Sequence, residues 1–178
     1  MSLLMELHHE VDRPVSDVVT GIPSGIGALD ILTSGWQPET SIILGARPSM
    51  GKTALMLKFA LSAAQNGDVP IIFSLEMSAK SLLRRMATAF GNINGFEARN
   101  PQNMEVSKQR RWMDAITYLS ELDFEIYDHS YQTIQYIRSK VRKAQKKYEG
   151  KRIIAMIDYL TLIENAGKFT SEHAKYSD

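Results

Sequence analysis

Cysteine is absent from this sequence of 178 residues, so neither a disulfide framework nor a thiolate metal site can form. The composition fits a reducing compartment, and the cytoplasm is the expected location. Long hydrophobic runs are missing too: no stretch approaches the roughly 18 to 20 apolar residues of a membrane span. The opening "MSLLMELHHEVDRP" carries acids and histidines where a signal peptide carries a basic and then an apolar region. We therefore expect neither secretion nor a membrane partner.

Charge of one sign is also not in excess, since the net charge is +1. The strong basic surplus of many nucleic-acid binders is absent, although a local stripe can still exist. Such a stripe lies between Arg138 and Arg152, on a segment whose apolar residues recur at helical spacing. Two interpretations stay open: the solvated face of a helix packed on the core, or a surface that meets phosphate or a partner.

What is present is enough for one globular domain, with 44% hydrophobic and 23% charged residues. Residues 1–19 show no sustained hydrophobic period and are predicted to be a linker or arm, whose first residues are a possible remnant of cloning. The predicted domain covers residues 20–178. Apolar runs alternate with helical patterns, which predicts an α/β fold with a mostly parallel sheet and helices on both faces. The expected strands are 41–45, 69–76, 124–128 and 152–163; the expected helices are 26–32, 51–66, 77–90, 107–122 and the basic segment.

Between the third and fourth of these helices the pattern loosens. Residues 91–104 hold glycines, a proline and several asparagines, which predicts a surface loop or a poorly ordered segment. For the helix that precedes this stretch, Ser78 is the expected N-cap. Trp36 and Trp112 could stack on bases, but their spacing matches no nucleic-acid motif and favours core packing.

The stretch "GARPSMGKTAL", residues 45–55, joins an expected strand to an expected helix, which is the context of a phosphate-binding P-loop. Backbone N–H groups converge there on a helix N-terminus, whose partial positive charge favours phosphate. Lys52 would reach the β- and γ-phosphates, and the Thr53 hydroxyl would ligate Mg²⁺. A plain turn is the alternative. The predicted nucleotide-binding residues are Ala46, Arg47, Pro48, Ser49, Met50, Gly51, Lys52 and Thr53.

Two acids follow other expected strands. Asp158 ends the apolar run "MIDYL" at the strand end where ligands of open α/β sheets gather, so it fits the Walker B role as a Mg²⁺ ligand. Glu76 closes "IIFSLE" at the same sheet edge and could orient and deprotonate an attacking water. Its alternative is a charge favourable to the dipole of the next helix. The sequence thus predicts catalytic roles for Glu76 and Lys52 and metal ligation by Thr53 and Asp158.

Together these stretches resemble the RecA-like ATPase domain of DnaB-type replicative DNA helicases. The resemblance covers most of residues 20–163, and "ARPSMGKT" followed by "SLEMS" is its specific part. It implies ATP and Mg²⁺ as cofactors, Glu76 as catalytic base, Asp158 as Walker B acid and a phosphate contact or bracing role for Arg47. It also implies a homohexamer, translocation on single-stranded DNA and, as partners, a primase or a helicase loader.

The match has departures. Trp36, Glu39 and the segment 91–104 are unusual for the family and suggest a phage or prophage variant. The family continues past the Walker B strand with DNA-contacting loops, an arginine finger and the strand between the P-loop and Walker B strands. The expected domain is therefore incomplete on its C-terminal side, with an open slot in the sheet. Two rivals remain: a RecA-like ATPase of the recombinase or signalling type, and a fragment that binds nucleotide without unwinding.

Overall fold

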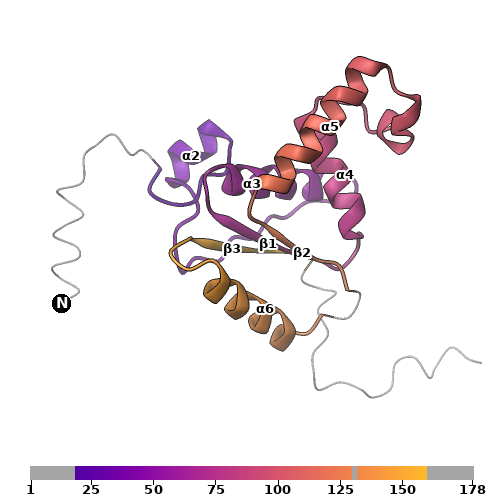
Figure 1. Cartoon of the computed structure of the whole chain (residues 1–178). Coiled ribbons are helices and arrows are strands. Elements are labelled where there is room, and N and C mark those ends of the chain that lie inside the picture. The colour runs from indigo at the N-terminus through magenta and orange to yellow at the C-terminus, as the bar shows by residue number, and fades with distance from the viewer. Residues whose placement is uncertain (1–18, 130–131, 160–178) are drawn as a thin grey trace, which may run out of the picture.

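The protein is described here by a computed structural model, which places residues 19–129 and 132–159. Three parallel strands form the sheet in the order β2-β1-β3, with β1 at Val69–Ser74, β2 at Glu125–Tyr127 and β3 at Ile153–Asp158. Figure 1 shows α3, α4 and α5 on one side of this sheet and α6 on the other. The predicted α/β class, the parallel pairing and the helices on both faces are confirmed.

Alternation along β1 distributes its side chains between two cores, because successive residues of a strand point to opposite faces. Ile72 packs with α3 (Lys52–Gln65), α4 (Ala79–Phe90) and α5 (Val106–Glu121). Ile71 and Phe73 pack with α6 (Ile134–Lys147). Every residue of β1 is buried, which explains why its first five residues are an unbroken apolar run. Ser78 caps α4 as predicted, accepting a hydrogen bond from the backbone N–H of Ser81 at 3.3 Å.

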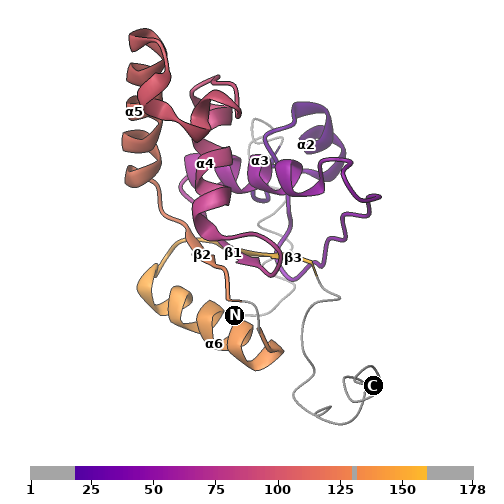
Figure 2. The same cartoon turned by 90° about the vertical axis from the view of Figure 1, so that its right-hand side faces the viewer.

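The predicted strand at 41–45 is wrong. Residues 41–47 have no regular secondary structure, and every residue from 41 to 51 is exposed; Ile43 keeps 81% of its surface. A strand exists only when a neighbour accepts its hydrogen bonds, and among the described residues β3 is the last strand on that side of the sheet. Residues 41–47 therefore run as an irregular coil between α2 (Gly27–Thr33) and α3 (Figure 2).

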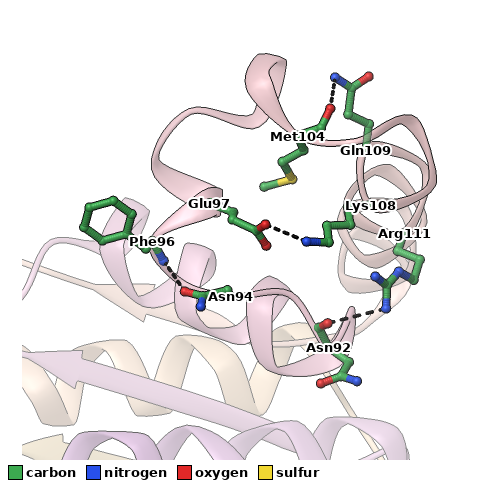
Figure 3. A network of polar contacts seen from close by, with 8 residues as sticks. All are labelled: Asn92, Asn94, Phe96, Glu97, Met104, Lys108, Gln109 and Arg111. Atoms are coloured by element: carbon green, nitrogen blue, oxygen red, sulfur yellow. Dashed lines mark hydrogen bonds and ion pairs between the residues drawn. The ribbon is translucent and has the colours of Figure 1, made fainter.

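Residues 91–104 form turns and short helices with defined contacts, so of the two predicted alternatives, a surface loop or a poorly ordered segment, the second is wrong. Two short 3₁₀ helices, η1 (Glu97–Arg99) and η2 (Pro101–Asn103), surround a small core of Ile93, Ala98 and Met104, with Trp112 packed against it. Polar contacts close the segment onto α5 (Figure 3): Lys108 Nζ lies 2.6 Å from Glu97 Oε1, and Gln109 Nε2 donates to the Met104 carbonyl at 3.0 Å. The asparagines that signal a loop here serve as turn formers over a local core.

An ion pair ties the start of the described chain to the sheet. The guanidinium of Arg152, one residue before β3, donates to both carboxylate oxygens of Asp68, one residue before β1, at 2.7 and 3.0 Å. The same group donates to the Thr20 carbonyl at 3.0 Å. Nearby, Trp36 packs edge-on against Phe59 of α3, with ring centroids 5.1 Å apart, so this tryptophan belongs to the core as expected. The predicted arm, 1–19, lies almost wholly outside the described residues.

We expect Met104→Ala to loosen the 93–104 segment while leaving the sheet intact. Removing a buried thioether costs about 2 kcal/mol, which corresponds to roughly 30-fold faster hydrogen exchange of the amides that depend on it. Met113→Ala, on an α5 side chain that is 61% exposed, is the matched control and should change nothing. Amides of 93–104 that exchange at unfolded-chain rates in the unmodified protein would contradict the small core.

Candidate nucleotide-binding site

The start of α3 carries an outward-facing turn. Ser49 and Gly51 both have left-handed backbones, with φ of 65° and 89°, and the Met50 N–H donates to the Arg47 carbonyl at 3.3 Å. Gly51 is the N-cap of α3 and supplies no side-chain acceptor, so the first N–H groups of the helix lack a capping side chain. A Cβ added at Gly51 would meet no atom within 4 Å, so the turn opens onto free space. Unbonded N–H groups at a helix start are suited to anions.

Three of the predicted site residues meet at the carboxyl end of β3. Asp158 is 2% exposed and is the last residue of that strand. The Thr53 hydroxyl donates to its Oδ2 at 2.6 Å, and Lys52 Nζ lies 2.9 Å from its Oδ1. The first turn of α3 is thereby joined to the sheet edge by two side-chain contacts between segments about 105 residues apart in sequence.

The Oδ1 atom of Asp158 has spare acceptor capacity. It is buried without a hydrogen bond, because Lys52 Nζ approaches within 2.9 Å but outside hydrogen-bonding geometry. Buried carboxylate oxygens normally have a partner. An oxygen of this kind beside the Thr53 hydroxyl is a donor set that fits Mg²⁺, which binds through one or two protein oxygens and keeps several waters. The residues present therefore fit the metal.

Glu76 lies at the same edge of the sheet. In the β1–β3 register Ser74 pairs with Asp158, and the Leu75 N–H donates to the Asp158 carbonyl at 2.9 Å. Glu76 is the next residue, and its side chain is exposed. The bend that carries it is fixed by Ser74, whose hydroxyl donates to the Met77 carbonyl at 2.7 Å. An exposed carboxylate is thus held two residues beyond the row of Asp158, without an ion-pair partner among the described residues.

Only some of the predicted site residues are therefore in contact with one another. Lys52, Thr53 and Asp158 are in contact, and Glu76 follows the neighbouring strand end. The loop residues Ala46, Arg47, Pro48, Ser49 and Met50 are exposed and make no side-chain hydrogen bond within the described part of the chain. Their proposed phosphate contacts stay a prediction.

Sequence reasoning missed two residues near this edge. Lys52 Nζ lies 4.2 Å from the ring centroid of Tyr159, a cation–π contact that orients the lysine stem. Gln132 is fully buried, and its Nε2 donates to the carbonyls of Tyr127 and His129 at 2.9 and 3.1 Å, which links it to the carboxyl end of β2. Tyr159 adjoins Asp158 in sequence, so its place could have been inferred. Gln132 gave no signal, because a glutamine after a strand is ordinarily a solvated loop residue.

Comparison with protein-family models identifies the family of the chain that carries this site. The model of the DnaB-like helicase C terminal domain matches residues 21–178. This chain belongs to that family. The fold is likewise that of solved structures: a solved ATPase domain matches with a TM-score of 0.89 at 36% identity, over 94% of this chain and 59% of that one.

Relatives of this DnaB-like domain are replicative helicases. It is 35% identical over 98% of its length to replicative DNA helicase DnaB of Helicobacter pylori strain 26695, and 40% identical over 84% of its length to replicative DNA helicase DnaC of Bacillus subtilis strain 168. It covers 35% and 33% of those two proteins, about a third of their length. The DnaB-like family uses nucleotide, which agrees with the RecA-like fold. No helix in the described ranges has the length and apolarity to cross a membrane.

Thr53→Val tests the junction between α3 and β3. The substitution removes the hydroxyl that donates to a buried carboxylate, and a buried acceptor that loses its partner costs about 1–3 kcal/mol. We expect the free energy of unfolding in urea, measured without nucleotide, to fall by that amount. Thr53→Ser keeps the donor and is the control. Equal stability of the valine and serine variants would contradict the 2.6 Å hydrogen bond.

Proposed function

We propose that this chain is the ATP-hydrolysing motor domain of a replicative DNA helicase, which couples hydrolysis to translocation on single-stranded DNA and so to duplex unwinding. The observation that carries the proposal is the meeting of Lys52, Thr53 and Asp158 at one strand end, beside the open turn before α3. The residues of this meeting point are those that a P-loop and a Walker B acid require.

Each of these side chains has a separable task. Lys52 is positioned at the helix start to neutralise phosphate charge, and Tyr159 restrains its stem. Thr53 and Asp158 would supply the oxygens for Mg²⁺, which would offset negative charge on the phosphates. Asp158 contacts both Lys52 and Thr53, so the lysine charge is held directly beside the proposed metal ligands. For Arg47, which is exposed in the loop, we propose a phosphate contact as well.

Glu76 is the proposed general base. This role is supported by its position after β1, at the same sheet edge as Asp158, and by its exposed carboxylate, which forms no ion pair with another described residue.

The partners proposed are those of the relatives. A DnaB-like replicative helicase studied for its interactions with primase matches with a TM-score of 0.89 at 35% identity. By this likeness we infer a cytoplasmic protein that acts as a homohexamer on single-stranded DNA, with a primase or a helicase loader as further partners. A recombinase or signalling ATPase is the rival. Steady-state ATP hydrolysis with and without single-stranded DNA separates the motor from a signalling ATPase, and a strand-separation assay separates it from a recombinase.

Lys52→Ala should reduce ATP hydrolysis by about two orders of magnitude or more, because the variant loses the positive charge directed at the phosphates. Lys58→Ala, which removes an exposed lysine from the second turn of α3, is the control and should hydrolyse normally. Turnover by Lys52→Ala within a few-fold of the unmodified protein would remove Lys52 from the mechanism.

Glu76→Gln should abolish turnover while keeping ATP affinity within a few-fold, because a glutamine cannot accept the proton from water but preserves the shape of the side chain. Binding of a fluorescent ATP analogue and single-turnover hydrolysis measure the two effects separately. Glu121→Gln at the exposed end of α5 provides the control. Lost affinity with turnover preserved at saturating ATP would instead make Glu76 a binding residue.

A further inference from the structure

The basic stripe is concentrated on one helix. Between Ile134 and Lys147, α6 carries six lysines and arginines and no acid. The chain as a whole has a net charge of +1, so these six cations leave −5 for everything else. A helix that is only solvated ordinarily mixes both signs at spacings of three and four residues, where like charges repel. The charge on α6 is segregated instead.

Some cations of α6 and its C-terminal turn have structural partners. Lys147 Nζ lies 2.9 Å from Glu125 Oε1, and Lys151 Nζ lies 2.6 Å from Asp123 Oδ2. The Lys147 contact belongs to a coupled group: burial and the hydrogen bond to Glu125 raise the pKa of Tyr127 to about 12. Side-chain hydrogen bonds, first with Tyr148 and then with Glu125, raise the pKa of Lys147. These two lysines therefore form ion pairs within the domain.

Lys140 contacts aromatic rings instead of a carboxylate. Its Nζ lies 4.6 Å from the centroid of the Tyr127 ring and 5.2 Å from that of Tyr136, so the ammonium rests against aromatic faces. This cation therefore also contributes to the packing of α6 on the sheet.

Four others have no carboxylate partner within the described ranges, and they share one side of the helix. The sheet holds α6 through Ile137 and Ala144, which fixes its inner face. The outer face, turned away from the sheet in Figures 1 and 2, carries the unpaired set, called here the α6 stripe. It consists of Arg138, Arg142, Lys143 and Lys146, all exposed.

Spacing makes the α6 stripe a linear array. Arg138, Arg142 and Lys146 are four residues apart, so a rise of about 1.5 Å per residue sets the three charges in a row about 12 Å long. A shallow surface hollow is lined by Arg142, Gln145, Lys146 and Glu149, so guanidinium, ammonium and carboxamide donors share one opening. Glu149 is the nearest acid in sequence, and it makes no ion pair with either cation.

We propose that the α6 stripe binds the phosphate backbone of single-stranded DNA, as a contact surface separate from the nucleotide edge of the sheet. The proposal rests on the proposed function, in which single-stranded DNA is the track. A row of regularly spaced cations matches a chain of regularly spaced phosphates. No aromatic residue of the stripe is available to stack on bases, so the contact is with the backbone and independent of sequence.

Two double variants with equal charge change provide the test. Lys143→Gln/Lys146→Gln removes two stripe lysines that have no carboxylate partner among the described residues, and Lys147→Gln/Lys151→Gln removes two lysines that have such partners. Binding of a labelled oligothymidylate is measured by fluorescence anisotropy over a series of salt concentrations. Each lost phosphate contact lowers the slope of log K against log salt by about 0.7, so the stripe variant should lose about 1.4 and the paired variant less than half of that.

The outcomes separate the two proposals. Binding of oligothymidylate by the unmodified protein, stimulation of its ATP hydrolysis and the reduced slope of the stripe variant together support the inference. Equal slopes for both double variants would show that only net charge matters, and an unchanged slope for the stripe variant would show that the stripe does not contact the DNA backbone; either result overturns this inference and leaves the motor function standing. An unmodified protein that binds no oligothymidylate overturns the motor function as well. Thermal melting establishes that both variants fold, and Arg138→Gln/Arg142→Gln is the second variant of the stripe.

Discussion

Parallel pairing between β1 and β3 is the constraint on which the site depends. Ser74 lies opposite Asp158, and one further hydrogen bond from the Leu75 N–H extends the ladder past both strand ends. This register fixes the height of Asp158 and of the bend carrying Glu76 at one edge. A slip by one residue would turn Asp158 to the other face of the sheet, away from α3. The buried carboxylate can hold Lys52 and Thr53 only in the register observed.

The two faces of the sheet are covered by different helices with different surfaces. The face covered by α3, α4 and α5 holds the larger core, and α3 reaches from it to the nucleotide edge. The opposite face is covered by α6, whose inner side is apolar and whose outer side is cationic. Every strand of the sheet contributes to both cores, so nucleotide chemistry and the charged helix are connected through a few side chains of β1, above all Ile71, Ile72 and Phe73.

Local patterns predicted most of this architecture. The apolar runs indicated β1, β2 and β3, and Ser78 indicated the start of α4, because burial and capping each act over a few residues. The strand at 41–45 failed because strand formation requires a hydrogen-bonded neighbour that apolar composition cannot guarantee. The order in 91–104 was missed because its small core joins positions too irregularly spaced to show a period. At the site, Thr53 and Asp158 were placed by motif, whereas Gln132 acts through contacts that only the folded chain brings together.

The clamp of Arg152 on Asp68 and Thr20 has a mechanical meaning. Arg152 directly precedes β3, and β3 runs for six residues to Asp158, a span of about 20 Å of hydrogen-bonded strand. The Thr20 carbonyl is therefore connected directly to the start of β3 through this guanidinium, in addition to the backbone bridge between Ile22 and Trp36. The far end of β3 is the carboxylate that contacts the start of α3. One strand thus joins the first described residues to the edge where Lys52 and Thr53 lie, so a force applied at Thr20 would have a short path to that edge.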